Sequence, residues 1–337
     1  MKVAIVHDDL VQWGGAERVL EGICEIYPDA PIFTSVFDFG NEELRRRFGA
    51  KKIHTSFLQR IPGWKYLYKI LLPLYPMAFE QFNFDGYDLV LSHTTRFAKC
   101  IITKPETKHI SYVHTPPRFL WHFSGITHFG LGEILMNWLR ILDRVTAERV
   151  DYFLAGSENA ARRIKKIYRR DSKVVYPYIN LKRFMGVKTS DGDLPAGRQG
   201  YFVIIGRPNK YKRFDLADRA CQKLNLELKV ISGGYSDAEV VRIMSQCKAL
   251  IIPGIEDFGL TSLEAQALGK PVIAYKEGGA LETVIEGKTG EFFGSDLEEV
   301  LSNFNPKKYK SEDCINNAKK FSKENFLSNF KQTVASL

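Results

Sequence analysis

Two glutamates, Glu256 and Glu264, are separated by seven residues and enclose a Phe-Gly pair at the start of a predicted helix. The segment follows an apolar run that predicts a buried strand. Because backbone N–H groups at a helix N-terminus bind phosphate or hydroxyl oxygens, we expect Gly259, Leu260 and Thr261 to contact a ligand. Glu264, about one turn into the helix, can bind the vicinal hydroxyls of a ribose. The pattern favours a phosphorylated, hydroxyl-rich ligand at this strand end.

A cluster of cationic residues follows another predicted strand, at residues 201–205. Arg207 comes soon after this strand, and Lys212 precedes a predicted helix at 215–224. A guanidinium binds two phosphate oxygens at once and an ammonium acts as a point charge, so the pair suits a diphosphate. In isolation the same cluster is also compatible with a solvated basic loop.

Paired glycines, Gly14 and Gly15, lie between the first predicted strand, Val3–Val6, and a predicted helix at Ala16–Tyr27. Glycines at this place let the backbone approach a ligand closely, although a plain turn uses them equally well. The segment lacks the spacing GxGxxG, which argues against a dinucleotide site. Asp8 and Asp9, at the end of the same strand, are candidates either for an acceptor contact or for a turn cap.

Short apolar runs alternate with helical patterns along the chain, which predicts an α/β fold of two doubly wound, Rossmann-like domains. Such domains bind ligands at the carboxyl ends of their strands, so we expect the site in a cleft between them. We place the domains at residues 1–186 and 187–319, with a helix at about 320–337 packing back on the first. The predicted strands are Val3–Val6, Leu89–Leu91, Ile110–Val113, Tyr152–Ala155, Tyr201–Ile205, Leu228–Ile231, Leu250–Ile252 and Val272–Ala274.

Composition limits the class of protein. The 337 residues are 45% hydrophobic and 26% charged, which fits two globular domains, and the net charge of +9 favours anionic partners. No apolar run reaches the length of a membrane span, and the first residues predict a strand rather than a signal peptide. The five cysteines are scattered without a CxxC pair, which indicates free thiols in the cytoplasm.

Two short motifs in the sequence are also found at the active sites of known enzyme classes. Asp191-Gly192-Asp193 reads as the DxD motif that binds manganese in single-domain glycosyltransferases, but its turn-like setting argues against a metal site. Asp257-Phe258-Gly259 spells the DFG of protein kinases, but the other kinase motifs are missing from the sequence. Four histidines lack ligand spacing and are expected to have core or surface roles: His93, His109, His122 and His128.

The chain resembles the retaining, two-domain GT-B glycosyltransferases of family 4, which include sucrose synthase, bacterial glycogen synthases and many mannosyltransferases. Segments 211–215 and 278–285 most resemble the bacterial O-antigen type mannosyltransferases, which use GDP-mannose. The resembling motifs follow the family order over nearly the whole chain: Gly14-Gly15-Ala16-Glu17, Gly206-Arg207 with Lys212-Arg213, Glu256 with Glu264, Pro271–Ala274 with Gly278-Gly279, and Glu282–Gly287 with Thr289-Gly290.

The resemblance implies a role for each candidate residue. His114, after the strand that ends at Val113, corresponds to a histidine that contacts the transferred sugar, and we group it with Glu256 as catalytic. The donor contacts implied are Arg207, Lys212 and Gly14 or Gly15 on the diphosphate, Glu264 on the ribose, and Glu256 by the sugar with the amides of Gly259, Leu260 and Thr261.

The resemblance also implies the reaction: transfer of a hexose, with mannose from GDP-mannose favoured, to a lipid-linked or polysaccharide acceptor with retention. It implies no cofactor, no metal and no side-chain base, and we expect no nucleic-acid partner. The alternatives are a UDP-sugar transferase or epimerase of the same fold, and a non-catalytic nucleotide- or polyanion-binding protein.

Aromatic and basic side chains are mixed in the segments 57–84 and 119–142, with Trp64 and Tyr68 among them. Such mixtures suit the headgroup region of an anionic membrane. They suit helices that cover the first domain equally well. Peripheral contact with the inner face of a membrane is therefore an open expectation.

Overall fold

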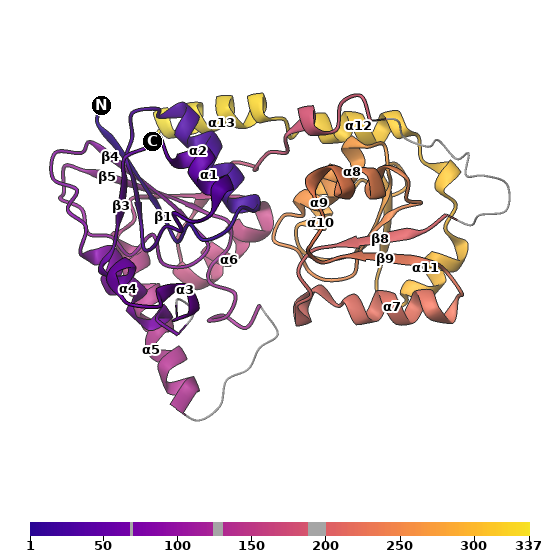
Figure 1. Ribbon diagram of the computed structural model, residues 1–337, viewed down its shortest axis with the longest axis horizontal. Helices are drawn as coiled ribbons and strands as arrows, with labels where there is room; N and C mark the ends of the chain where they lie inside the picture. Colours follow the sequence, from indigo (N-terminus) through magenta and orange to yellow (C-terminus); the bar gives the residue numbers. More distant parts are fainter. Residues whose placement is uncertain (68–69, 124–130, 188–199) are drawn as a thin grey trace. The chain divides into compact units, whose positions relative to one another are not determined.

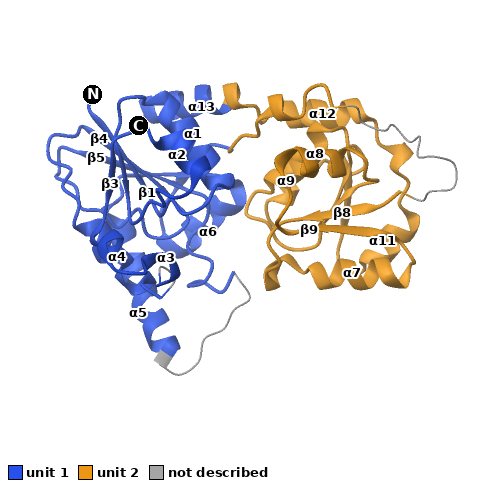
Figure 2. Ribbon diagram, viewed as in Figure 1, with its two compact units in different colours: residues 1–176, 326–337 blue, residues 177–325 orange. Residues whose placement is uncertain are grey.

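The computed structural model describes residues 1–67, 70–123, 131–187 and 200–337 (Figure 1). These residues form two compact units, coloured separately in Figure 2: unit 1 is Met1–Tyr176 with Phe326–Leu337, and unit 2 is Pro177–Asn325. The division falls before residue 187 because the segment that follows Tyr176 packs within unit 2. There the Ile179 N–H donates to the Phe321 carbonyl over 3.0 Å, and Ile179 and Phe184 belong to the hydrophobic core.

Unit 1 contains a seven-stranded parallel sheet in the order β3-β2-β1-β4-β5-β6-β7. Its two faces carry different core residues, because alternate side chains of a strand point to opposite sides. On the first strand Ala4 and Val6 join one core cluster, and His7 lies on the opposite face with Val3 and Ile5. The strands are β1 (Val3–His7), β2 (Ile32–Thr34), β3 (Ile53–Thr55), β4 (Leu89–Thr94), β5 (Lys108–Val113), β6 (Tyr152–Ala155) and β7 (Ser172–Val174).

Helices connect these strands and include the end of the chain. In the last helix Phe326 and Phe330 pack against Tyr112 of β5, with ring centroids 6.4 and 5.9 Å from it. The α-helices are α1 (Gly15–Ile26), α2 (Glu42–Phe48), α3 (Trp64–Leu67), α4 (Tyr75–Glu80), α5 (Leu131–Thr146), α6 (Glu158–Tyr168) and α13 (Lys323–Ala335), the last of which begins among the residues of unit 2.

Unit 2 contains a five-stranded parallel sheet in the order β12-β11-β10-β8-β9. Val203 and Leu250 face one core cluster, whereas Ile204 and Ile251 face the other, so both sides of the sheet are covered. The strands are β8 (Phe202–Ile205), β9 (Leu228–Ile231), β10 (Leu250–Ile252), β11 (Val272–Tyr275) and β12 (Gly290–Phe293). The α-helices are α7 (Phe214–Lys223), α8 (Asp237–Ser245), α9 (Leu260–Ala267), α10 (Ala280–Thr283), α11 (Leu297–Asn303) and α12 (Ser311–Lys319).

The prediction of two α/β units, each with a parallel sheet, is confirmed. All five cysteines are buried free thiols. Burial raises the pKa of Cys24, Cys247 and Cys314 to about 12, so these thiols stay protonated at neutral pH. Within the described ranges, none of the helices combines the length and the hydropathy that crossing a bilayer requires.

Candidate active site

The segment between β10 and α9 holds the first of the paired glutamates. The chain enters α9 through Gly259, whose φ of +95° is one that residues with a Cβ rarely adopt. The Gly279 N–H donates to the Glu256 carbonyl over 2.8 Å. A Cβ at Gly279 would lie only 2.3 Å from Phe258 Cα. The absence of a side chain at Gly279 therefore allows the close backbone contact that holds the Glu256 segment in place.

Glu256 and Lys212 form an ion pair in which Lys212 Nζ lies 2.5 Å from Glu256 Oε1. The two side chains are only 14% and 16% exposed, so water screens their interaction weakly. Both residues line a small cavity at the carboxyl ends of β8 and β10, together with Thr261 of α9. The structure thus brings together three of the predicted site residues in unit 2.

Arg207 follows β8 and is exposed at the surface of unit 2. It comes directly after Gly206, which has a φ of +140°. A Cβ at Gly206 would lie 3.2 Å from Lys212 Nζ. The backbone that carries Arg207 therefore passes close to the ammonium of Lys212.

Glu264 lies in α9 and is 7% exposed. Its Oε1 accepts a hydrogen bond from Arg183 Nη1 at 2.9 Å. Arg183 also forms an ion pair with Asp237 at the start of α8. The carboxylate predicted to bind ribose is therefore held by a guanidinium that the motif-based analysis did not single out.

Unit 1 contains the remaining candidates. Gly14 precedes α1 and Gly15 begins it, with Glu17 buried in the first turn. His114 follows β5 and is partly buried. Its Nε2 lies 2.7 Å from Nε2 of His93. The other ring nitrogen of His93, Nδ1, lies 2.9 Å from Nδ1 of His7.

These histidines come from neighbouring strands, because His7 pairs in register with His93, and His93 with Tyr112, two residues before His114. Glu17 completes the row, with Oε1 3.9 Å from His7 Nε2. From the sequence we expected a core or surface role for His93 and no role for His7. The pattern that indicates this row is a histidine at the carboxyl end of each of three strands.

Burial affects the pKa values in this row differently. Burial alone lowers the pKa of His7, but the charge and hydrogen bonding of Glu17, with Asp8 and Asp9, outweigh it and raise that pKa above 6.5. His93 has no carboxylate beside it, so burial and the neighbouring imidazoles His114 and His7 lower its pKa well below 6.5. His93 is therefore neutral at physiological pH.

Asp8 has a structural role in this unit. Its carboxylate is 1% exposed and accepts hydrogen bonds from the N–H groups of Thr95, Arg96, Phe97 and Ala98 over 2.6–3.0 Å. It therefore caps the loop after β4, which is the second of the two expectations for this residue. Asp9 forms a 2.6 Å ion pair with Arg96.

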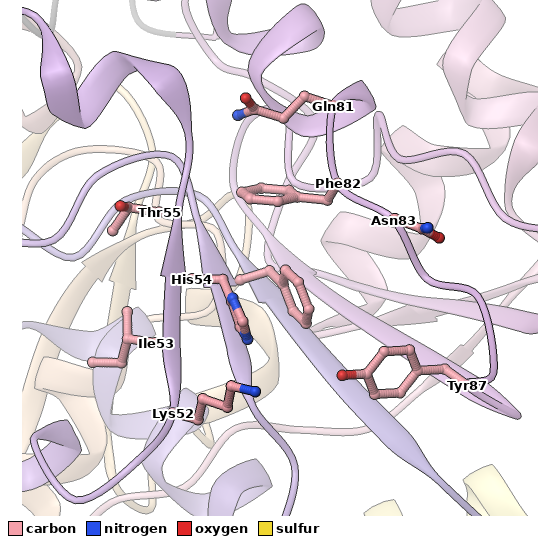
Figure 3. Close-up of a pocket in the computed structure, with 9 residues that line it drawn as sticks. Lys52, Ile53, His54, Thr55, Gln81, Phe82, Asn83 and Tyr87 are labelled. Carbon is pink, nitrogen blue, oxygen red and sulfur yellow. The ribbon is translucent and has the colours of Figure 1, made fainter.

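Another pocket in unit 1, of about 520 Å³, lies beside the edge strand β3 (Figure 3). Aromatic rings line it from one side, and the ring of Phe33 stacks on His54 at 4.5 Å between centroids. Lys52, Gln81 and Asn83 add polar groups. None of the residues predicted for the active site lines this pocket.

Within the described residues, no group of three or more His, Cys, Asp or Glu side chains is arranged to hold a metal ion. The Asp191–Asp193 motif lies outside the described residues.

Family models match both halves of the chain. Residues 13–183 match the family model of Glycosyltransferase Family 4, and residues 193–321 match that of Glycosyl transferases group 1. The alpha-1,3/1,6-mannosyltransferase ALG2 of Mus musculus is 24% identical over 354 residues, which cover 86% of this chain and 83% of that protein. The Homo sapiens protein of the same name is 24% identical over 351 residues and covers 86% and 82%.

Solved structures show the same fold. The Anabaena protein Alr3699/HepE in complex with UDP-glucose has a TM-score of 0.69 at 18% identity, covering both chains completely. Sucrose-phosphate synthase from Thermosynechococcus elongatus has a TM-score of 0.72 at 15% identity, covering 100% of this chain and 99% of that one. With a family match over half of its length and two parallel α/β units, the chain belongs to the family 4 glycosyltransferases of the GT-B fold.

Proposed function

We propose that the protein is a retaining mannosyltransferase that transfers mannose from GDP-mannose to a lipid-linked or polysaccharide acceptor in cell-surface glycan synthesis. The mouse and human relatives, which match 86% of the chain, bear the name alpha-1,3/1,6-mannosyltransferase. The observation that carries a transfer reaction is the Lys212–Glu256 ion pair beside the N-terminus of α9. It supports a donor site in unit 2.

A donor site must stabilise the charges that develop as the leaving group departs. Breaking the bond between sugar and phosphate places negative charge on the departing diphosphate and positive charge on the sugar ring. Lys212 and Arg207 are the cations proposed to stabilise the diphosphate, together with the backbone N–H groups of Gly259, Leu260 and Thr261. Because these groups supply the positive charge, we expect transfer to proceed without a metal ion.

Glu256 is the residue proposed to face the positive charge on the sugar. In the structure its carboxylate is paired with Lys212. A bound diphosphate competes for that ammonium, which leaves the carboxylate available to stabilise the sugar ring in the transition state. Glu264, held by Arg183, is proposed to bind the ribose hydroxyls.

Unit 1 is proposed to supply the acceptor contacts, with His114 touching the transferred sugar and Gly14 or Gly15 contributing backbone contacts to the diphosphate. Retention lets the acceptor attack the face that the diphosphate leaves. A diphosphate oxygen can then take the proton of the acceptor hydroxyl, so the proposal needs no side-chain base.

A thermal-shift panel with GDP, UDP and ADP in EDTA tests the donor assignment first. A ligand at 100 times its dissociation constant stabilises the folded protein by about 2.7 kcal/mol, which is a measurable shift. Stabilisation by GDP alone supports GDP-mannose, and radiolabelled GDP-mannose with extracted lipids or polysaccharide then tests transfer. Stabilisation by UDP alone would reject the mannosyl assignment but not the fold, and no stabilisation at all would favour a polyanion-binding protein.

Contact with an anionic membrane is a second part of the proposal. Ile134, Trp138 and Ile141 lie on one face of α5 at helical spacing and are 66%, 45% and 63% exposed. An exposed apolar stripe on a protein of net charge +9 suits an anionic bilayer surface. Trp64 does not belong to this surface, because it is only 9% exposed and packs in the core, and Tyr68 lies outside the described residues.

Cosedimentation with phosphatidylglycerol vesicles measures this contact. The double variant I134S/I141S should bind such vesicles less than the parent protein. The matched control is Ile102→Ser, which changes another exposed isoleucine of unit 1, 52% exposed, that is not part of α5. Equal binding by the double variant and the control would reject the α5 surface.

A further inference from the structure

We propose that Glu17, His7 and His93 are positioning residues that fix the proton of His114 on Nδ1, so that His114 meets the sugar only as a hydrogen-bond donor. The row of four side chains crosses the carboxyl ends of β1, β4 and β5, with Glu17 contributed by α1. The sugar contact of His114 rests on the proposed function, whereas the position of its proton does not.

Oxygen atoms that can only accept lie near both ring nitrogens of His7. Glu17 Oε1 lies 3.9 Å from Nε2. The carbonyl oxygen of His93, which can only accept, lies 3.2 Å from Nδ1. The carbonyl contact places a proton on Nδ1. The charge and hydrogen bonding of Glu17 outweigh burial and raise the pKa of His7, which favours the imidazolium with a proton on Nε2 as well. This charge is compatible with burial because Glu17, 5% exposed, is buried beside it.

The protonation of His7 determines which ring nitrogen of His93 carries a proton. Since His7 Nδ1 carries a proton, it donates to His93 Nδ1 across the 2.9 Å contact, and that nitrogen must be the acceptor. His93 is buried beside two other imidazoles, which hold its ring neutral. Its single proton is therefore on Nε2.

The proton on His93 determines which ring nitrogen of His114 is protonated. His93 Nε2–H donates across the 2.7 Å contact to His114 Nε2, which must accept. A neutral His114 then has its proton on Nδ1. Nearby, residue 156 is a glycine, and a Cβ there would lie 3.6 Å from Nδ1.

This arrangement has a chemical consequence. The lone pair of His114 Nε2 accepts the hydrogen bond from His93, so it is not available to take the proton of an acceptor hydroxyl. Its Nδ1–H is a directed donor for a sugar oxygen, and its direction is set before the donor binds. This state agrees with a retaining transfer in which the diphosphate, rather than a side chain, takes the acceptor proton.

Histidine ring NMR tests the proposal without any substrate. In protein labelled with ¹⁵N-histidine, long-range ¹H–¹⁵N correlations distinguish a protonated ring nitrogen from one with a lone pair, and His114→Gln assigns the His114 signals by their loss. We expect His114 with Nδ1 protonated and Nε2 unprotonated, and His7 with both nitrogens protonated. A proton on Nε2 of His114, or a neutral His7, would overturn the proposal whatever sugar the enzyme transfers.

Two substitutions of His93 test the coupling. In His93→Gln the side-chain oxygen can accept from His7 and the amide nitrogen can donate to His114, so the proton of His114 should stay on Nδ1. His93→Phe keeps an aromatic ring but removes both hydrogen bonds, so His114 should show a proton on Nε2 in part or all of the molecules. An unchanged His114 spectrum in folded His93→Phe would reject the positioning role.

The kinetic expectation separates positioning from folding. Loss of one directed hydrogen bond in the transition state lowers kcat about tenfold, so His93→Phe should lose that much more than His93→Gln. GDP binding, measured by calorimetry, should be equal in the two variants because its proposed contacts lie mainly in unit 2. Equal kcat values with different His114 spectra would show that the proton position has no bearing on transfer.

Discussion

The ammonium of Lys212 lies 2.5 Å from the carboxylate of Glu256, at the carboxyl ends of β8 and β10. Both side chains are mostly buried, so the pair stabilises each charge in the absence of ligand. The diphosphate and the sugar of a donor are proposed to interact with these two groups separately. The two residues that pair with each other are therefore also the proposed partners of the donor.

Glu256→Gln tests the carboxylate. This change keeps the shape of the side chain but removes the negative charge proposed to stabilise the sugar in the transition state. We expect sugar transfer to fall at least about 100-fold, with the dissociation constant for GDP nearly unchanged. Initial rates and calorimetry measure the two quantities, and the exposed glutamate of the same unit, Glu277→Gln, is the matched control. Normal turnover in Glu256→Gln would remove this residue from the mechanism.

Lys212→Ala tests the diphosphate contact. A hydrogen bond to a charged group contributes about 1.5–3 kcal/mol, so binding of GDP should weaken roughly 10- to 100-fold. Guanosine, which has no phosphate, should bind the variant and the parent equally. Lys307→Ala, which removes an exposed lysine of unit 2, serves as the control. If guanosine binding weakened as much as GDP binding, Lys212 would support the unit rather than the diphosphate.

Arg183→Ala tests the orientation of Glu264. Without the 2.9 Å hydrogen bond from Arg183, the Glu264 carboxylate is free to turn away from a ribose. We expect GDP to bind about tenfold more weakly, which corresponds to the loss of one hydrogen bond. Binding of 2′,3′-dideoxy-GDP, which lacks the hydroxyls, should not change. Asp237→Asn removes the other partner of Arg183 and should have the smaller effect, whereas equal losses for both nucleotides would contradict a ribose contact.

The sequence predicted the architecture well where strands are long or fully apolar. Strands β8 and β10 are continuous apolar runs that the sequence predicts. Strands β2, β3 and β7 are not predicted, because each has three residues of which at least one is polar. Strand β12 (Gly290–Phe293) was missed as well, and its glycine and glutamate interrupt the apolar pattern. The parallel alternation was still sufficient for the fold, because the strands that were not predicted lie at or next to the edges of the two sheets.

The site was predictable only as separate motifs. Glu256 and Lys212 each belong to a motif, but their pairing depends on neighbouring strands that the sequence does not order. Arg183 is 81 residues from Glu264 and lies in no motif, so its contact could not be anticipated. The row from Glu17 to His114 likewise depends on strand order, since His93 is 86 residues from His7 and 21 from His114.

Asp8→Asn tests the loop after β4. The carboxylate accepts from the N–H groups of Phe97 and Ala98 at 2.8 Å, among others, and an amide nitrogen in its place would face donors. Because buried N–H groups would then lack an acceptor, we expect the free energy of unfolding to fall by about 3–5 kcal/mol. Urea unfolding measures this change, and the exposed Asp29→Asn is the control.

The pH dependence of that variant separates charge from packing. Burial alone raises the pKa of Asp8, but Arg96, His7 and backbone hydrogen bonds outweigh it, so the folded-state pKa lies below 3.8. The ionised carboxylate therefore stabilises the fold fully above that pH, and the contribution is lost as the pH falls through the folded-state pKa. Parent protein should lose stability more steeply than Asp8→Asn below pH 3.8, so that the two converge in acid. A constant difference between them down to low pH would mean that Asp8 acts through its shape and hydrogen bonds alone.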